Sequence, residues 1–93
     1  MKEKLFKIIT HYGVIPQLKY FQSEVFELNE AIINEEFEHH EENILHIAEE
    51  IADVQVMLNQ FKEYYKITDE EIKKVMKYKI KRQLGRIENE RKD

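Results

Sequence analysis

The chain has 93 residues, which is enough for one domain, spanning 1–93, with a modest core. Its composition is 42% hydrophobic and 37% charged with two glycines and one proline, which argues against a many-stranded fold and favours long helices. A formal charge of −4 argues against a broad basic surface for nucleic acid, and the lack of cysteine excludes disulfides and zinc–thiolate sites. No apolar run approaches the ~18 residues of a membrane span, so we expect a soluble, cytoplasmic protein.

The chain begins with a predicted short helix. Residues from Lys2 to about His11 are amphipathic, and Gly13 can take the conformation that closes a helix. Pro16 then suits the first turn of a second helix, which is expected to run to about Asn34. The apolar residues of this second helix recur at spacings of three and four, as on one helical stripe, and are Leu18, Phe21, Val25, Leu28 and Ile32.

The second half of the chain predicts two more helices. The stretch from Asn34 to Asn43 is acidic and lacks clear periodicity, so it is predicted to be a loop or a frayed helix end. A third helix is indicated by the stripe of Ile44, Ile47, Ile51, Val54, Leu58, Phe61 and Tyr65. Thr68 and Glu71 then form the signature of a capping box, which opens a fourth helix with the apolar residues Ile72, Val75, Met76, Ile80 and Leu84. The tail from Glu88 to Asp93 is expected to fray. Together these elements predict an all-α antiparallel bundle of about four helices, one short and three longer.

Two acidic pairs lie beside the stripes of the second and third helices. Glu24 falls at the edge of one stripe with Glu27 just beyond it, and Glu50 flanks the other with Asp53 following. Residues three apart share a helix face, so helices that pack by these stripes would gather four carboxylates at one margin of the core. Such crowding is costly without a cation, and Mg²⁺ prefers oxygen ligands. The spacing predicts a metal site, while a chain with 19 acidic residues also forms such pairs on solvated faces.

The fourth helix carries the opposite charge. Lys79, Arg82 and Arg86 follow Ile72 and Val75 along one stripe, so these cations are expected to point towards the margin of the pocket. There they suit phosphate oxygens, which arginine binds with two donors at once. The alternative is that they pair with the acidic helices or solvate the helix end.

Histidines offer a second kind of metal ligand. His39 and His40 lie in the polar linker and His46 on the third helix, and no second ligand cluster supports a transition-metal site. The five tyrosines at helical spacing are more typical of partly buried packing residues than of base-stacking ones.

Four stretches together resemble the MazG-like branch of the all-α nucleoside triphosphate pyrophosphohydrolases, over nearly the whole chain. They are Gly13-Val-Ile-Pro-Gln-Leu18, Gln22-Ser-Glu-Val-Phe-Glu-Leu28, Glu49-Glu-Ile-Ala-Asp-Val-Gln-Val-Met-Leu58, and Tyr78-Lys-Ile-Lys-Arg82 with Arg86-Ile87. The family pattern is EExxE followed on the next long helix by EExxD. One departure is Ser23, which stands where the pattern has its first glutamate and which helical geometry points away from the four carboxylates.

The resemblance implies Mg²⁺-dependent hydrolysis between the α and β phosphates of a nucleoside triphosphate, giving a nucleoside monophosphate and pyrophosphate. Mn²⁺ is expected to be able to replace Mg²⁺. By position, the implied metal ligands are Glu24, Glu27, Glu50 and Asp53.

The remaining site residues are expected around this metal. Lys79 and Arg82 are implied at the phosphates, with Arg86 on the same stripe. Either Glu27 or Glu49 is expected to accept the proton of the attacking water. Gln17 and Tyr20 share a flank of the second helix with Glu24, which makes them candidates for contacting the base or ribose.

Members of this family are commonly dimers or dimers of dimers, so we expect a homo-oligomer whose pocket lies close to a subunit interface. Three alternatives remain. A phosphoribosyl-ATP pyrophosphohydrolase has the same fold class and a related acidic motif. A non-catalytic helical adaptor or regulator is suggested by Ser23, and a nucleic-acid-binding bundle is disfavoured by the acidic balance.

Overall fold

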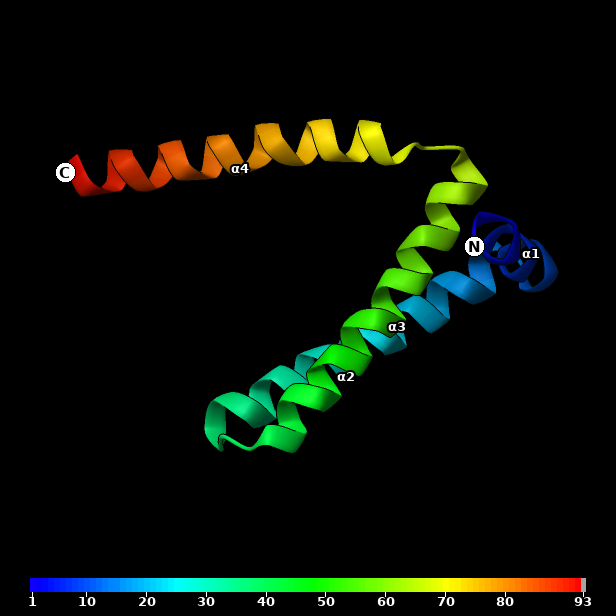
Figure 1. Ribbon diagram of the computed structural model, residues 1–93, viewed down its shortest axis with the longest axis horizontal. Helices are drawn as coiled ribbons and strands as arrows, with labels where there is room; N and C mark the ends of the chain where they lie inside the picture. Colours follow the sequence, from blue (N-terminus) through cyan, green and yellow to red (C-terminus); the bar gives the residue numbers. More distant parts are fainter. Residues whose placement is uncertain (93) are drawn as a thin grey trace.

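The computed structural model describes residues 1–92, which form four helices and no strand (Figure 1). The helices are α1 (Lys2–Tyr12), α2 (Val14–Phe37), α3 (Glu41–Tyr65) and α4 (Asp69–Lys92). The all-α prediction is therefore confirmed for the described part of the chain. None of these helices combines the length and the apolar character that a membrane crossing requires.

Gly13 joins α1 to α2 and turns the chain sharply. Its φ of 93° is positive, a conformation that favours glycine, and its N–H donates to the Ile9 carbonyl at 2.8 Å. Pro16 sits within the first turn of α2, where its missing N–H has no intrahelical partner to lose. The predicted boundary between the first two helices is confirmed to within two residues, because α2 begins at Val14.

The predicted loop from Asn34 to Asn43 is wrong in extent. α2 continues through Phe37 and α3 begins at Glu41, which leaves only residues 38–40 outside the helices. Most side chains at this end of the hairpin are exposed. Helical turns that face solvent carry polar residues, so the loss of apolar periodicity marks a loss of burial and not the end of the helix.

The last helix begins as predicted. The N–H of Glu71 donates to the hydroxyl of Thr68 at 3.1 Å, which is one half of a capping box. The expected fraying from Glu88 is wrong as far as Lys92, because α4 continues to that residue, and Asp93 lies outside the described residues. No glycine or proline occurs in this last turn to stop the helix.

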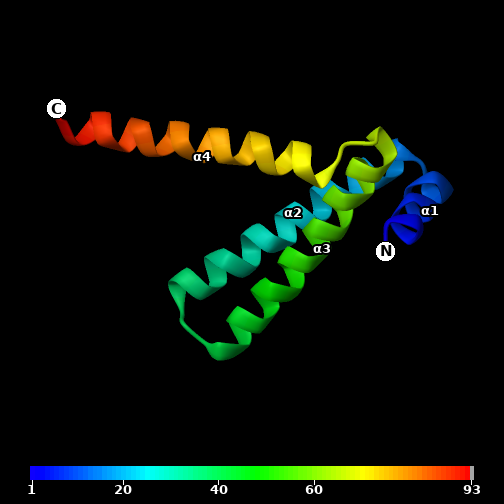
Figure 2. The same ribbon diagram turned by 45° about the horizontal axis from the view of Figure 1, so that its top comes forward.

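α2 and α3 form an antiparallel hairpin, α1 packs across one end of it, and α4 extends away (Figures 1 and 2). Leu5 and Ile9 are the buried residues of α1. Within residues 1–92, α4 packs on none of the other helices, although its first residue, Asp69, forms an ion pair with Lys62 of α3. The predicted four-helix bundle is therefore corrected to a packed unit of three helices from which α4 projects.

A single seam holds the hairpin together, and its residues alternate at spacings of three and four along both helices. The seam residues of α2 are Val14, Gln17, Phe21, Glu24, Leu28, Ala31 and Glu35, and those of α3 are Asn43, Ile47, Glu50, Val54, Met57 and Phe61. All of them are buried or half-buried. The rings of Phe21 and Phe61 meet edge to face across the seam, with their centroids 5.7 Å apart.

The seam uses only one edge of each predicted stripe. On α2, Phe21 lies in the seam, whereas Val25 is 42% exposed. The helices are turned so that Glu24 and Glu50 enter the seam, and the expectation that these two acids stand at the margin of the core is corrected. A stripe this wide can pack against two neighbouring elements at once. The spacing of its residues does not show which of its edges the other helix of the hairpin covers.

Candidate metal centre

Two carboxylates lie inside the α2–α3 seam, at positions that paired helices normally fill with apolar side chains. Glu24 is 5% exposed and Glu50 is 7% exposed. The Oε2 atom of each is buried without a hydrogen-bond partner among the described residues. Burying an unpaired carboxylate oxygen costs free energy, so these two side chains create a local demand for positive charge.

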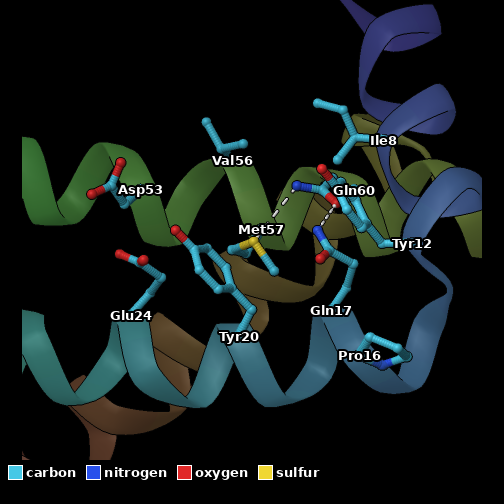
Figure 3. Close-up of a pocket in the computed structure, with 10 residues that line it drawn as sticks. All are labelled: Ile8, Tyr12, Pro16, Gln17, Tyr20, Glu24, Asp53, Val56, Met57 and Gln60. Carbon is cyan, nitrogen blue, oxygen red and sulfur yellow. Dashed lines mark hydrogen bonds between the residues drawn. The ribbon is translucent and has the colours of Figure 1, made fainter.

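Glu27 completes a group of three acids. One carboxylate oxygen from each of Glu24, Glu27 and Glu50 lies within 4.8 Å of the other two. Glu27 is exposed, so the group opens to solvent on its side. Asp53 lies opposite Glu24 at the same side of the seam (Figure 3). The structure thus brings three of the four predicted ligands together and places the fourth beside them.

The surroundings of Glu24 and Glu50 disfavour the ionised forms of both side chains. Burial raises the pKa of the Glu24 carboxyl, and the charges of Glu27 and Asp53 raise it further against a lowering hydrogen bond from Tyr20. Burial likewise raises the pKa of Glu50, and the neighbouring carboxylates add to the effect. Burial and the neighbouring carboxylates both penalise the ionised acids and outweigh the lowering effects of Tyr20 on Glu24 and of His46 on Glu50, so a bound cation or a proton relieves the same penalty.

A pocket of about 570 Å³ opens beside the carboxylates, between α1, α2 and α3 (Figure 3). Glu24 and Asp53 line one end of it, and Tyr12 lies at the other, with Gln17 and Gln60. The volume is within the range of roughly 300–1,000 Å³ that small-molecule sites occupy. The pocket therefore joins an acidic end to a polar, partly aromatic end.

A buried amide pair forms the far end of the pocket. Gln17 Nε2 donates to Gln60 Oε1 at 2.8 Å, and the two residues are 8% and 2% exposed. Among the described residues, Gln60 Nε2 donates only to the thioether sulfur of Met57, at 3.5 Å, which is a weak acceptor. Since each amide both donates and accepts, the pair retains hydrogen-bonding capacity for a polar ligand.

Tyr20 lies between the two ends of the pocket, with its hydroxyl directed towards Glu24 and Asp53 (Figure 3). The hydrogen bond to Glu24 and the charge of that carboxylate raise the pKa of Tyr20, so the phenol stays protonated and can donate. Gln17 and Tyr20, which the sequence singled out for nucleotide contact, therefore share one pocket with the carboxylates. Their contact with a substrate stays a prediction.

Two other predicted positions lie outside the carboxylate group. The side chain of Glu49 is 75% exposed, and its Oε2 lies 3.9 Å from His46 Nδ1. Ser23 is also exposed, and its hydroxyl donates to the Lys19 carbonyl at 3.5 Å. The orientation predicted for Ser23 relative to the four carboxylates stays a prediction.

The basic residues of α4 are not brought to the carboxylates within one chain. Lys79, Arg82 and Arg86 are all exposed on a helix that leaves the packed unit. The guanidinium of Arg82 lies over the ring of Tyr78 at 5.8 Å, and Arg86 donates to Gln83 at 3.4 Å. The expectation that this stripe points towards the pocket margin is wrong for the isolated chain, because α4 does not fold back on the hairpin.

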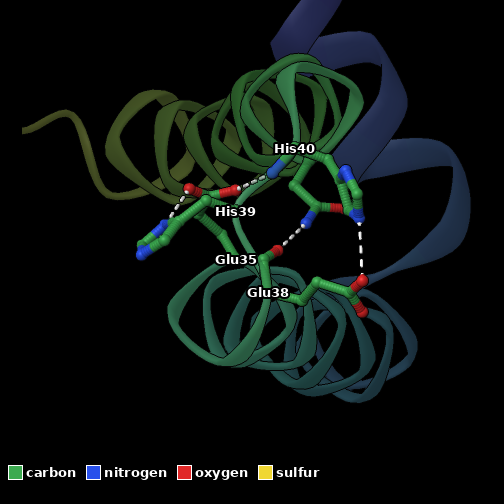
Figure 4. A network of polar contacts seen from close by, with 5 residues as sticks. Glu35, Glu38, His39 and His40 are labelled. Carbon is green, nitrogen blue, oxygen red and sulfur yellow. Dashed lines mark hydrogen bonds and ion pairs between the residues drawn. The ribbon is translucent and has the colours of Figure 1, made fainter.

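The histidines of the hairpin tip belong to a local polar network (Figure 4). Glu35 accepts from His39 Nδ1 at 2.7 Å and from the N–H of His40 at 2.9 Å, while His40 Nε2 lies 3.2 Å from Glu38. The hydrogen bond from His39 lowers the pKa of Glu35, and the same bond raises the pKa of His39. Among the described residues, no histidine joins a group of three potential metal ligands.

Sequence reasoning missed part of the pocket. Gln60 lies seven residues after Asp53 on α3, so a heptad numbering of that helix would have placed both on one side. Tyr12 carries no such signal, because it reaches the pocket through the turn at Gly13, which sets the direction of α1.

The chemistry available at this site is that of oxygen ligands. The ligand group of Glu24, Glu27 and Glu50 consists of carboxylates, which suit hard divalent cations such as Mg²⁺, and the orphaned Oε2 atoms of Glu24 and Glu50 fit such an ion. The imidazole of His46 lies outside this group, with its Nε2 3.9 Å from Glu50 Oε1. Comparison of the chain with models of protein families, with curated proteins and with solved structures finds no match.

Proposed function

We propose that this chain is a Mg²⁺-dependent nucleoside triphosphate pyrophosphohydrolase of the MazG-like kind, cleaving between the α and β phosphates. The observation that carries the proposal is the pair of buried carboxylates beside the 570 Å³ pocket, each with an Oε2 atom that has no hydrogen-bond partner among the described residues. A purely structural seam would gain stability from apolar residues at these two positions. A site for a metal-bound triphosphate needs carboxylates there, and the order of the acidic motifs supports the same function.

Glu24, Glu27 and Glu50 would hold the cation, with Asp53 beside them, and Mn²⁺ would be accepted in place of Mg²⁺. When bound, the ion offsets the charge of the triphosphate and lowers the pKa of water. The seam fixes Glu24 and Glu50, so these two set the position of the site. The exposed Glu27 retains more freedom to move.

Glu27 is proposed as the group that accepts the proton of the attacking water. It belongs to the carboxylate group and faces solvent, whereas Glu49 lies outside that group. The water oxygen bonds to the α phosphorus as the bond from that phosphorus to the α–β bridging oxygen breaks. Pyrophosphate departs with the electron pair of that bond, and Glu27 later releases the proton to solvent.

The far end of the pocket is proposed to hold the nucleoside. The amides of Gln17 and Gln60 offer donors and acceptors to a base edge, and Tyr12 offers a ring face. Tyr20 lies between this end and the carboxylates, where its hydroxyl suits the ribose or the α phosphate.

The phosphate-binding cations are proposed to come from a second copy of the chain. Lys79 and Arg82 cannot reach phosphates bound at the carboxylates of their own chain while α4 projects from the packed unit. They share a stripe of α4 with the exposed Val75, so a copy that covers this stripe would place them beside its own carboxylates.

Mixing two inactive variants is expected to restore activity if α4 acts across copies. One chain carries Glu50→Gln and the other carries Lys79→Ala with Arg82→Ala; refolded together, they form assemblies with one intact site. Pyrophosphate release should recover to about a quarter of the wild-type rate, as random pairing of two variants gives half mixed dimers with one of two sites intact. Recovery no greater than the sum of the separate variants would show that α4 acts within its own chain.

A nucleotide panel tests the proposed function directly. The purified chain is incubated with Mg²⁺ and each ribo- and deoxyribonucleoside triphosphate, and with phosphoribosyl-ATP, and the products are identified. A monophosphate with pyrophosphate from a nucleoside triphosphate supports the proposal. Turnover of phosphoribosyl-ATP alone would assign the related pyrophosphohydrolase activity, and no turnover of any compound would favour the non-catalytic adaptor.

A further inference from the structure

One hydrogen bond between buried side chains lies at the far end of the pocket. Gln17 Nε2 of α2 donates to Gln60 Oε1 of α3 at 2.8 Å, and both residues line the pocket (Figure 3). Gln60 is only 2% exposed, whereas Gln17 keeps 8% of its surface. Gln17 is therefore the amide that a ligand in the pocket meets first, and Gln60 supports it from behind.

This bond leaves part of the Gln17 amide free for a ligand. Within residues 1–92 no group donates to Gln17 Oε1. The buried side-chain atoms without a partner in that part of the chain are the Oε2 atoms of Glu24 and Glu50, so the unpaired Gln17 oxygen is not sealed off. A ligand that donates a hydrogen bond can reach it from the pocket.

The direction of the bond between the two amides can reverse. Each carboxamide carries an N–H group and an oxygen, so a half-turn of both side chains makes Gln60 the donor and Gln17 the acceptor. The half-turn gives up only the contact of Gln60 Nε2 with the sulfur of Met57, which is a weak acceptor. Gln17 then faces the pocket with its N–H group in place of its oxygen.

The position of the two amides relates them to the carboxylates. A buried amide pair can also fix the register of two packed helices, but that role does not require a cavity beside it. Gln17 precedes Glu24 by seven residues and Gln60 follows Asp53 by seven, so the amides lie ~10 Å along the hairpin from these acids. All four residues line one pocket. A nucleotide with its phosphates at the carboxylates would bring its base to the amides.

We propose that Gln17 determines the base specificity of this site and that Gln60 is its positioning residue, which allows both orientations of the Gln17 amide. This rests on the proposed function, in which the nucleoside lies at this end of the pocket. The substrate class is then nucleotides whose base presents a donor and an acceptor side by side on one edge, in either order. Adenine and hypoxanthine carry these groups in opposite order, and so do cytosine and uracil.

Matched nucleotides test this reading of the base. With Mg²⁺ present, kcat/KM is measured for ATP against ITP and for CTP against UTP. The members of each pair should differ by less than about fivefold, because reversal of the amides changes only one weak contact. Purine riboside triphosphate, which lacks the exocyclic group of ATP, should be poorer by about tenfold or more, and Gln17→Met should abolish that difference. Gln22→Met is the control, at an exposed position of α2 outside the pocket, and should leave every ratio unchanged.

Fixing the direction of the amide should create a preference that the wild type lacks. Gln60→Glu would hold the N–H group of Gln17 towards the new carboxylate and its oxygen towards the base, and Gln17→Glu would present a carboxylate oxygen to the base directly. At about pH 8, which favours the ionised form of the new carboxyl, both variants should separate the members of each pair by about tenfold or more. Both should prefer the same member. A wild type that separates either pair by more than about 20-fold would overturn the proposal, and so would a Gln17→Met variant that still rejects purine riboside triphosphate.

A binding measurement distinguishes failure of this proposal from failure of the proposed function. AMP, IMP and purine riboside monophosphate are added with Mg²⁺ to the wild type and to Gln17→Met, and the rise in melting temperature is recorded. AMP and IMP should raise the melting temperature of the wild type by similar amounts and the analogue by less, with no such difference in Gln17→Met. This pattern without turnover of any triphosphate would remove the hydrolysis and keep the base specificity. Turnover of triphosphates without this pattern would remove Gln17 as the specificity residue.

Discussion

Glu50→Gln is expected to lower Mg²⁺-dependent pyrophosphate release by about 100-fold or more, because loss of even an outer partner of a metal ligand costs 10–100-fold. Glutamine keeps the shape of the side chain at this buried seam position, so the hairpin should remain folded. What it removes is the anionic oxygen that has no hydrogen-bond partner in the described chain. Initial rates at saturating nucleotide and increasing Mg²⁺ separate a loss of metal affinity from a loss of turnover.

Two exposed acids on the same helix provide the controls for this variant. Glu42→Gln removes a charge from the first turn of α3, far along the helix from Glu50, and should leave the rate within about twofold of wild type. Glu49→Gln should do the same if Glu27 accepts the proton, because Glu49 lies outside the carboxylate group. Full activity of Glu50→Gln would remove the metal centre from the proposed function.

The sequence alone predicted the helices and the members of the carboxylate group, since both follow from local rules. Periodicity, Gly13 and the Thr68 cap located the helices, and the spacing of three put each acidic pair on one face. The rotation of the α2–α3 seam was not predictable in this way. It depends on which edge of a wide apolar stripe the neighbouring helix covers, and that is decided by the whole assembly of helices.

The position of α4 could not be predicted from local sequence patterns, for a related reason. Its stripe of apolar and basic residues indicates that the helix needs a partner, but it does not identify that partner. In the single chain α4 projects freely, with Ile80 and Leu84 more than half exposed. A helix whose partner lies on another copy carries the same pattern as one that folds back on its own hairpin. The sequence therefore predicted that α4 is a helix but did not predict its position.

Removing the two charges of the carboxylate pair in the seam is expected to stabilise the metal-free fold. The double variant Glu24→Gln with Glu50→Gln is expected to melt at a higher temperature than the wild type when no divalent metal is present, by about 5 °C or more. Two buried negative charges are removed, each on an acid whose Oε2 atom has no hydrogen-bond partner among the described residues. Two glutamines at these positions can both donate and accept, as Gln17 and Gln60 do between the same two helices. Mg²⁺ should raise the wild-type melting temperature and leave that of the double variant unchanged.

The pH dependence provides an independent check on the same charges. Because the folded-state pKa values of Glu24 and Glu50 are raised, the folded chain binds more protons than the unfolded chain between the ordinary glutamate value of about 4.3 and the raised values. The metal-free wild type should therefore gain stability as the pH falls from neutral into this window. The double variant should lack that gain when both are measured by thermal melts at one chain concentration. A wild type that loses stability relative to the variant as the pH falls through this window would show that the fold stabilises the ionised forms of the two acids. In that case the two acids would not require a cation.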